Sequence, residues 1–288
     1  MILRADNIFF IFVGLVCLVA WTAVDLSLSF HSQIALVVIV VAVFGLPHGA
    51  LDVVISQRLG LFSTTRRLLG FHVFYLALVA FVLVIWSFAP AWCLAGFLLI
   101  SSWHFGGDWC GVTNRAGCWI LGIMVLSLPA AFNAEQMVVL YSTITGESLH
   151  SLVAVQGMLA PIALVGAVVV SSAALGRNPH LVVEMVMIFT LAWTLPPLLY
   201  FTVYFCGLHS MRHLVSTGFL PNSRTVFIAS AYTLVAIAIG FALAISQWDA
   251  NEALGIPLKA TFQLLAALTV PHMILIDGFV RDIPYASE

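Results

Sequence analysis

Five histidines lie in stretches of the sequence that are otherwise apolar enough to be buried in lipid: His48, His104, His209, His213 and His272. Ionisable side chains at membrane depth are costly, so they usually mark functional sites. His209 and His213 are four residues apart, which places both imidazoles on one face of a helix. Because imidazole is a good ligand for zinc, copper, iron and nickel, the five residues predict a metal centre inside a membrane protein.

The composition indicates a membrane protein. Of the 288 residues, 62% are hydrophobic and 8% are charged, whereas a soluble domain carries about 25% charged residues. The chain therefore lacks the polar side chains needed to cover a water-facing surface. The net charge of −2 gives no indication of a nucleic-acid partner.

The five cysteines are scattered and contain no CxxC pair, so we interpret them as reduced and mostly structural. They are Cys17, Cys93, Cys110, Cys118 and Cys206. Cys206 lies about one helical turn before His209, where the role of a small apolar packing residue is favoured over contact with the histidines.

A helix that crosses the bilayer needs about 20 mostly apolar residues. Ten segments meet this criterion, and a count of eight or nine spans is the alternative. The segments are 8–24, 34–56, 71–89, 91–109, 116–133, 152–175, 181–195, 198–216, 225–247 and 258–280. The sequence thus predicts an all-α, polytopic bundle of about ten transmembrane helices that forms a single catalytic domain over residues 1–288.

The basic residues predict the orientation, because lysine and arginine accumulate on the cytoplasmic side of a membrane. With a cytoplasmic N-terminus, ten spans place nine of the ten basic residues at or near that side and only Lys259 outside. The nine are Arg4, Arg58, Arg66, Arg67, Arg115, Arg177, Arg212, Arg224 and Arg281. We expect both termini to be cytoplasmic and the protein to be a multi-pass protein of the inner (plasma) membrane.

This orientation also predicts a common depth for the histidines. Nine to eleven residues separate them from the next arginine: His48 from Arg58, His104 from Arg115, His213 from Arg224, and His272 from Arg281. All four spans run from outside to inside, and each helical residue rises 1.5 Å. The histidines should therefore meet in one layer in the inner half of the bilayer, whereas unrelated core histidines would scatter in depth.

Two aspartates accompany the cluster. Asp52 is four residues after His48, and Asp108 is four residues after His104, so each pair can share a helix face. Metal-bound histidines usually donate their second N–H to a carboxylate, a carbonyl or water. We expect Asp52 and Asp108 to orient His48 and His104, with a solvated position at the cytoplasmic end of each helix as the alternative.

The other polar residues near these segments are assigned to surfaces and interfaces. They are His31, His72, His150, His180 and Asp277. Aromatic residues crowd the histidine segments, where they either line a channel for a long apolar ligand or serve in helix packing and interfacial belts. The candidates for substrate binding are Trp103, Phe105, Tyr200, Tyr204 and Phe205.

Four segments together resemble a known family. They are residues 45–52 (GLPHGALD), 103–106 (WHFG), 209–213 (HSMRH) and 271–273 (PHM). In this order they are similar to the Brp/Blh family of membrane β-carotene 15,15′-dioxygenases, and the resemblance runs through most of the chain. It implies a non-haem Fe(II) centre held by histidines. It also implies O₂-dependent cleavage of the central double bond of β-carotene into two all-trans-retinal molecules, and a retinal-using neighbour such as a microbial rhodopsin.

The predicted ligands of this iron are His48, His104, His209 and His213. We expect His272 to lie close to the iron without binding it, because five protein ligands would leave only one position on a six-coordinate ion. His272, Asp52 and Asp108 are then the candidate catalytic residues. β-Carotene is about as long as the bilayer core is thick and resides in lipid, so an embedded enzyme can take it in sideways and hold it with its centre beside the iron.

Two other classes of protein use histidines in membranes. A desaturase or hydroxylase with two irons shows several dense boxes such as HxxHH, whereas this chain has one HxxxH and no adjacent pair. A metal transporter would carry polar residues through both leaflets, but the outer halves of the histidine-bearing spans are almost wholly apolar. A haem electron carrier with two histidine ligands is the remaining alternative, and an absorption band at 400–430 nm would identify it.

Overall fold

The computed structural model describes residues 5–62, 64–216, 223–250 and 253–280, and these residues form helices and turns without a strand. The α-helices are α1 (Ala5–Thr22), α2 (Phe30–Val40), α3 (Leu46–Gly49), α4 (Asp52–Arg58), α5 (Thr65–Phe88), α6 (Pro90–Gly106), α7 (Arg115–Phe132), α8 (Ala134–Thr145), α9 (His150–Ala174), α10 (Pro179–Thr194), α11 (Pro197–Tyr204), α12 (Ser210–Ser216), α13 (Ser223–Ser246) and α14 (Ile256–Leu275). The predicted all-α class is confirmed.

Seven helices in the described part of the chain are long and apolar enough to cross a membrane, counting the α2–α4 and α14–η4 rods as single helices. They cover Ala5–Thr22, Phe30–Arg58, Thr65–Phe88, Arg115–Phe132, His150–Ala174, Ser223–Ser246 and Ile256–Gly278. The predicted spans 91–109, 181–195 and 198–216 are also helical, but their helices are shorter or interrupted. The count of ten spans stays a prediction, and so does the cytoplasmic location of the termini, which lie outside the described residues.

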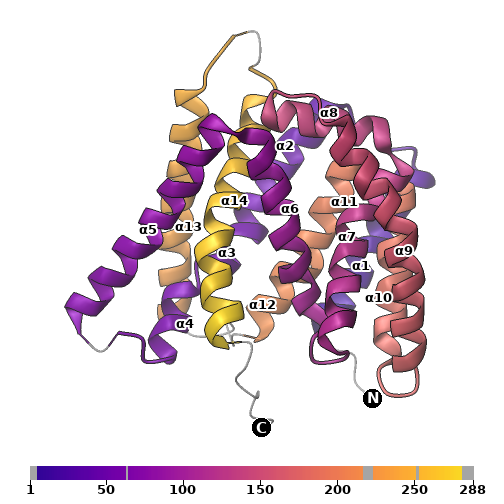
Figure 1. Ribbon diagram of the computed structural model, residues 1–288, viewed down its shortest axis with the longest axis horizontal. Helices are drawn as coiled ribbons and strands as arrows, with labels where there is room; N and C mark the ends of the chain where they lie inside the picture. The colour runs from indigo at the N-terminus through magenta and orange to yellow at the C-terminus, as the bar shows by residue number, and fades with distance from the viewer. Residues whose placement is uncertain (1–4, 63, 217–222, 251–252, 281–288) are drawn as a thin grey trace.

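The helices stand side by side as one bundle, with α5 leaning outward at its lower end (Figure 1). The loops at residues 59–62, 110–114 and 175–178 gather at one end of the bundle, and α8 lies at the opposite end (Figure 1). The arginines beside these three loops therefore share one end, as the charge pattern predicts. The twelve residues of α8 are too few to span a bilayer, which is why hydropathy alone did not reveal this helix.

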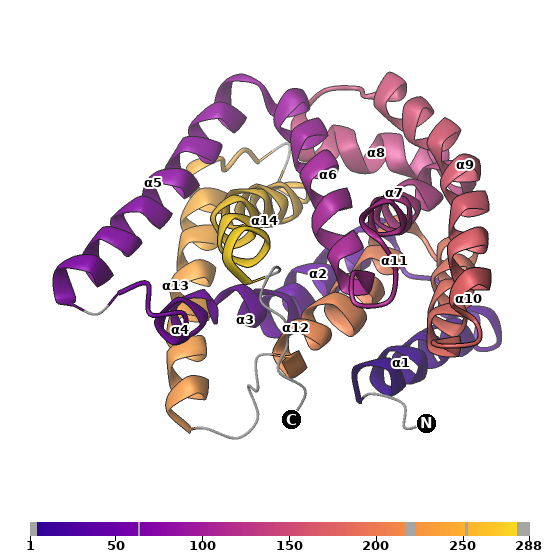
Figure 2. The same cartoon turned by 60° about the horizontal axis from the view of Figure 1, so that its bottom comes forward.

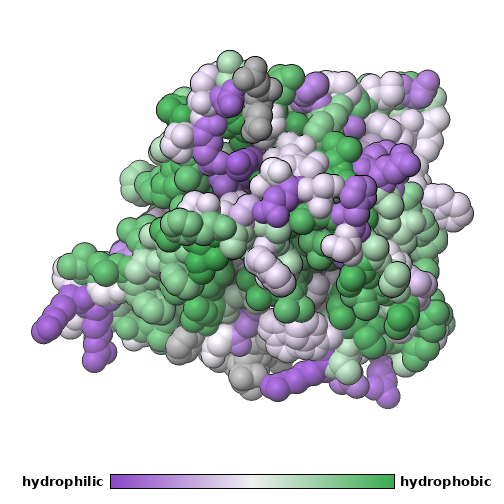
Figure 3. Space-filling view, turned by 45° about the horizontal axis from the view of Figure 1, so that its top comes forward, coloured by the Kyte–Doolittle hydropathy of each residue, from purple (hydrophilic) through white to green (hydrophobic). Residues whose placement is uncertain are grey.

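Large apolar side chains face outward on the long helices. Phe88, Trp92 and Phe227 are 84%, 81% and 74% exposed. Broad hydrophobic patches cover much of the face in Figure 3, and hydrophilic side chains gather at its lower margin and in its upper half. An exposed apolar surface of this extent suits lipid rather than water.

Three helical rods contain one turn of π-helix each. The π segments are η1 (Val41–Gly45), η3 (Phe205–His209) and η4 (Ile276–Val280), and a short 3₁₀ turn, η2 (Gly107–Trp109), ends α6. π-Turns are rare and are frequently found at functional sites. Each of the three lies beside a histidine of the cluster: η1 precedes His48, η3 ends at His209, and η4 follows His272.

Close packing between α6 and α7 holds the helix that carries His104. A Cβ atom on Gly122 would lie 1.8 Å from the carbonyl oxygen of Ser102, and one on Gly106 would lie 2.1 Å from that of Cys118. Only glycine permits this approach, in the way that small residues allow membrane helices to pack closely.

The interpretation of all five cysteines as reduced is wrong for two of them. Cys110 and Cys118 form a disulfide, because the turn between η2 and α7 brings their Cα atoms to 5.6 Å. Cys17, Cys93 and Cys206 are free. Cys206 is buried in the apolar core, in agreement with its expected packing role.

Candidate metal centre

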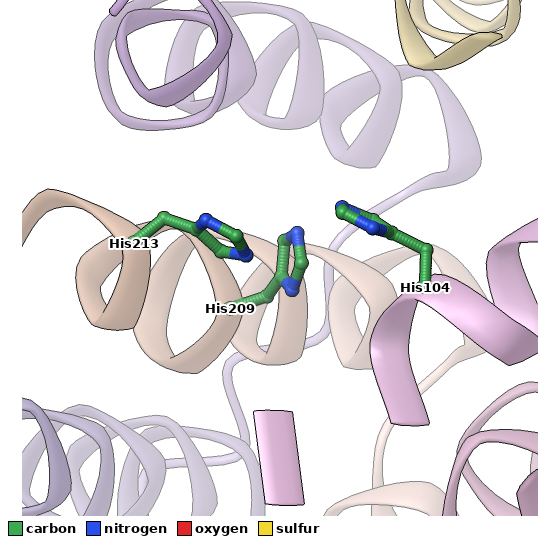
Figure 4. Close-up of side chains that lie close together, drawn as sticks. All are labelled: His104, His209 and His213. Atoms are coloured by element: carbon green, nitrogen blue, oxygen red, sulfur yellow. The ribbon is translucent and has the colours of Figure 1, made fainter. Parts of the chain in front are cut away.

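The five histidines converge from different helices on one buried point. His104 reaches it from α6, and His209 and His213 reach it from the η3–α12 rod (Figure 4). A ligand nitrogen of each of these three residues lies within 4.8 Å of those of the other two. His48 on α3 lies beside His209, with ring centroids 5.3 Å apart, and His272 on α14 lies beside His104, with ring centroids 5.1 Å apart. The five histidines therefore come together at one level of the bundle, whereas their depth in the bilayer stays a prediction.

Three of the rings share one pattern of hydrogen bonds. Each donates from Nδ1 to a carboxylate, while its Nε2 is buried without a hydrogen-bond partner. The pairs are His272 with Asp52 (2.7 Å), His209 with Asp108 (3.2 Å) and His104 with Asp277 (3.4 Å). A buried nitrogen without a partner is costly unless a ligand completes it, and histidines that bind a metal usually donate their second N–H to a carboxylate. The residues present therefore fit a metal ion.

The partners of the two predicted aspartates differ from the expectation. Asp52 pairs with His272 instead of His48, and Asp108 pairs with His209 instead of His104. The spacing of four residues places two side chains on one face only while the helix stays regular. A turn separates α3 from α4 between His48 and Asp52, and the α-helix ends at Gly106 before Asp108.

Asp277, which the sequence assigned to the interface, faces His104 instead. The carboxylate is mostly buried, with 12% of the side chain exposed. His48 has no carboxylate partner among the described residues, and its Nδ1 donates to the carbonyl of Gly45 and lies 3.1 Å from Oγ of Ser210. These contacts occupy Nδ1 and leave Nε2 as the ring nitrogen of His48 that could bind a metal ion.

From the sequence, Arg212 was used only as a positive charge that predicts the orientation. The structure places it in a buried network of hydrogen bonds and ion pairs. Its guanidinium donates to Asp6 (2.8 Å), to Glu184 (2.7 Å) and to the backbone carbonyl of Asp108 (3.0 Å). The second oxygen of Glu184 accepts from the indole N–H of Trp109 at 2.6 Å. The network joins α1, α10 and α12 to η2, and thereby holds the aspartate that orients His209. An arginine between two histidines of an apolar segment is the signal that reveals it.

An apolar cavity of about 300 Å³ borders the cluster. Four histidines of the cluster form part of its wall: His48, His104, His209 and His272. Phe105 and Phe205 line it as expected, but Trp103, Tyr200 and Tyr204 do not. The reason is the face on which each side chain lies. Trp103 packs against Trp119, Tyr200 donates to the carbonyl of Val125, and Tyr204 donates to Asp108.

Other cavity residues come from helices distant in the sequence. They include Phe71, His72, Tyr75, Phe97, Phe201 and Tyr232. His72, which was assigned to an interface, is half-buried in the cavity wall and lies 2.6 Å from the hydroxyl of Tyr232. Nothing in the local sequence marks these residues, because their positions depend on how helices remote in the sequence pack together, among them α5, α13 and α14 (Figure 2).

The cavity reaches the apolar surface of the bundle. Leu76 on α5 and Val235 on α13 both line it, and both are 54% exposed. Since these two helices present apolar residues to the outside, the cavity opens sideways toward the position of lipid.

The fold and the site define a polytopic helical membrane protein in which buried histidines border an apolar cavity. The sequence matches the family model described as Beta-carotene 15,15'-dioxygenase over residues 39–280. The chain belongs to this family and is an enzyme, a carotenoid-cleaving dioxygenase. It is 32% identical over 264 residues to the Beta-carotene 15,15'-dioxygenase of Uncultured marine bacterium 66A03, covering 86% of this chain and 94% of that relative. No solved structure shows significant similarity.

Proposed function

We propose that this enzyme holds one Fe(II) ion among its buried histidines and uses O₂ to cleave the central 15,15′ double bond of β-carotene, giving two all-trans-retinal molecules. The observation that carries the proposal is the position of the histidine cluster, which forms part of the wall of an apolar cavity open toward lipid. Carotene cleavage agrees with the name of the family and of the relative. The iron and the use of O₂ rest on the donor set.

His48, His104, His209 and His213 would hold the iron through one ring nitrogen each. Neutral imidazoles leave the ion its full positive charge, and the buried carboxylates around it balance that charge. Bound iron would supply the redox chemistry with O₂. Asp108 keeps the ring of His209 in place by accepting from Nδ1, and Tyr204 in turn donates to Asp108 at 2.9 Å. These groups are positioning residues, which determine where the histidine nitrogens point.

The cavity would bind the polyene chain and exclude water. Phe105 and Phe205 lie next to His209, with ring centroids 4.7 and 5.8 Å from it, so a polyene beside them is close to the cluster. A hydrocarbon offers no hydrogen-bonding group, so shape and burial must orient it. Holding the central double bond beside the metal site is then the main contribution of the protein to the rate.

Entry from the side suits a substrate that is dissolved in the bilayer. β-Carotene is about as long as the hydrocarbon core is thick and would pass between α5 and α13 without entering water. We place the enzyme in the inner (plasma) membrane, with lipid, β-carotene and O₂ as its partners. The retinal would pass to a retinal-using protein such as a microbial rhodopsin.

The test combines metal analysis of the purified protein with chromatography of pigments from cells that make β-carotene. We expect about one iron per chain and retinal in place of β-carotene. Alanine variants of His104 and His209 should lose both, whereas an alanine variant of the surface residue His31 should keep both. Purified protein that contains no metal, or an absorption band at 400–430 nm from haem, would refute the proposal.

A further inference from the structure

Four of the five rings form a closed square. In the order His48, His209, His104, His272, neighbouring ring centroids lie 5.3, 4.9, 5.1 and 5.2 Å apart, the last distance closing the square. Each ring stands nearly perpendicular to the next, at 73–87°. The residues on the diagonals of the square are not in ring contact. Histidines that merely filled space would have no reason to be spaced so evenly.

The fifth ring, His213, stands over this square. Its centroid lies 4.7 Å from that of His209, 5.6 Å from that of His104, and 5.7 Å from those of both His48 and His272. The five rings therefore occupy the corners of a square pyramid with His213 at the apex. A square pyramid is an octahedron that lacks one corner, so the arrangement suits a metal ion that prefers six ligands.

His272 carries the same marks as two of the predicted ligands. Its Nδ1 donates to Asp52 at 2.7 Å, and its Nε2 is buried without a hydrogen-bond partner, as in His104 and His209. Asp52 is fixed in turn by the hydroxyl of Tyr75 at 2.9 Å. A buried nitrogen without a partner is costly, so its position among the other rings suits a ligand atom.

We infer that His272 is a fifth ligand of the metal ion, opposite His209 across the square. The inference rests on the metal site of the proposed function and replaces the expectation that His272 stands beside the iron without binding it. That expectation assumed that five ligands leave too little room. β-Carotene has no donor atoms and needs no coordination position, so one remaining position is sufficient for a small second substrate.

The shape of the site also determines where the remaining position lies. The four residues of the square line the cavity, whereas His213 does not. The side of the square away from His213 thus borders the cavity that would hold the polyene. Five histidine ligands in this orientation would leave a metal ion one exchangeable position, on the side of the cavity.

Metal binding by purified variants tests the inference without relying on activity. His272→Gln should retain iron at least about tenfold less tightly, since even indirect changes around a metal cost 10–100-fold. His72→Gln is the matched control, because His72 lines the same cavity but bonds to Tyr232 outside the square. Reconstitution with Co(II) adds a spectroscopic readout: the visible bands of His272→Gln should be more intense than those of the wild type, as the coordination number falls, while those of His72→Gln should not change.

Wild-type iron affinity and an unchanged Co(II) spectrum in His272→Gln would overturn the inference and leave the proposed function standing. A wild-type protein that binds no metal would overturn both. Should His272→Gln fail to fold, X-ray absorption of iron in the wild-type protein decides the matter. Five imidazole ligands support the inference, and four contradict it.

Discussion

Replacing Arg212 by methionine should destabilise the protein severely. Methionine keeps much of the volume but removes the guanidinium that bonds to Asp6 and Glu184 at 2.8 and 2.7 Å. The two carboxylates are 0% and 4% exposed, so water cannot replace the lost partner. Removing one member of a buried ion pair costs about 3–5 kcal/mol, which is a large part of a total stability of about 5–15 kcal/mol.

The assay is unfolding in mixed micelles of increasing dodecyl sulfate content, followed by tryptophan fluorescence, which Trp109 beside Glu184 should report. Arg212→Lys keeps the charge but not the fork of donors, so its loss of stability should be smaller. A cycle with Glu184→Gln should give a coupling energy above about 1 kcal/mol, because the two residues are in contact. A loss below about 1 kcal/mol in Arg212→Met would refute the reasoning that the network is buried and essential.

Three further predictions concern the metal, the cavity and the topology. Asp108→Asn should weaken iron retention about 10–100-fold without unfolding the protein, and unchanged affinity would show that Asp108 does not orient His209. Leu76→Trp, at the mouth of the cavity, should lower β-carotene cleavage at constant iron content; full activity would exclude entry between α5 and α13. A cysteine at Gly176 should resist labelling from the periplasmic side of intact cells while one at Glu135 reacts, and the reverse result would invert the predicted orientation.

The sequence by itself determined the all-helical membrane fold and the convergence of the five histidines. Both follow from simple geometry. The bilayer sets the length of an apolar helix, and a constant rise per residue turns position in the sequence into depth. Histidines at a similar distance from the next arginine are therefore expected in one layer, and the packing of the helices into a bundle brings that layer together.

Only the tertiary structure decided which groups face one another inside that layer. Spacing predicted Asp52 beside His48 and Asp108 beside His104, but the helices break between the members of each pair and redirect the side chains. The π-turns η1 and η3 have the same effect, since each changes the face on which the following residues lie. Local spacing specifies a neighbour only along a regular helix.

Local sequence patterns also could not predict contacts between helices that are remote in the sequence, for a second reason. The buried partners of Arg212 lie on α1 and α10, and His72 meets Tyr232 across α5 and α13. Apolar helices in lipid resemble one another in hydropathy, so composition does not specify which of them pack together. The residues of the cavity wall and the square of histidines can therefore be identified only from the packing of the helices.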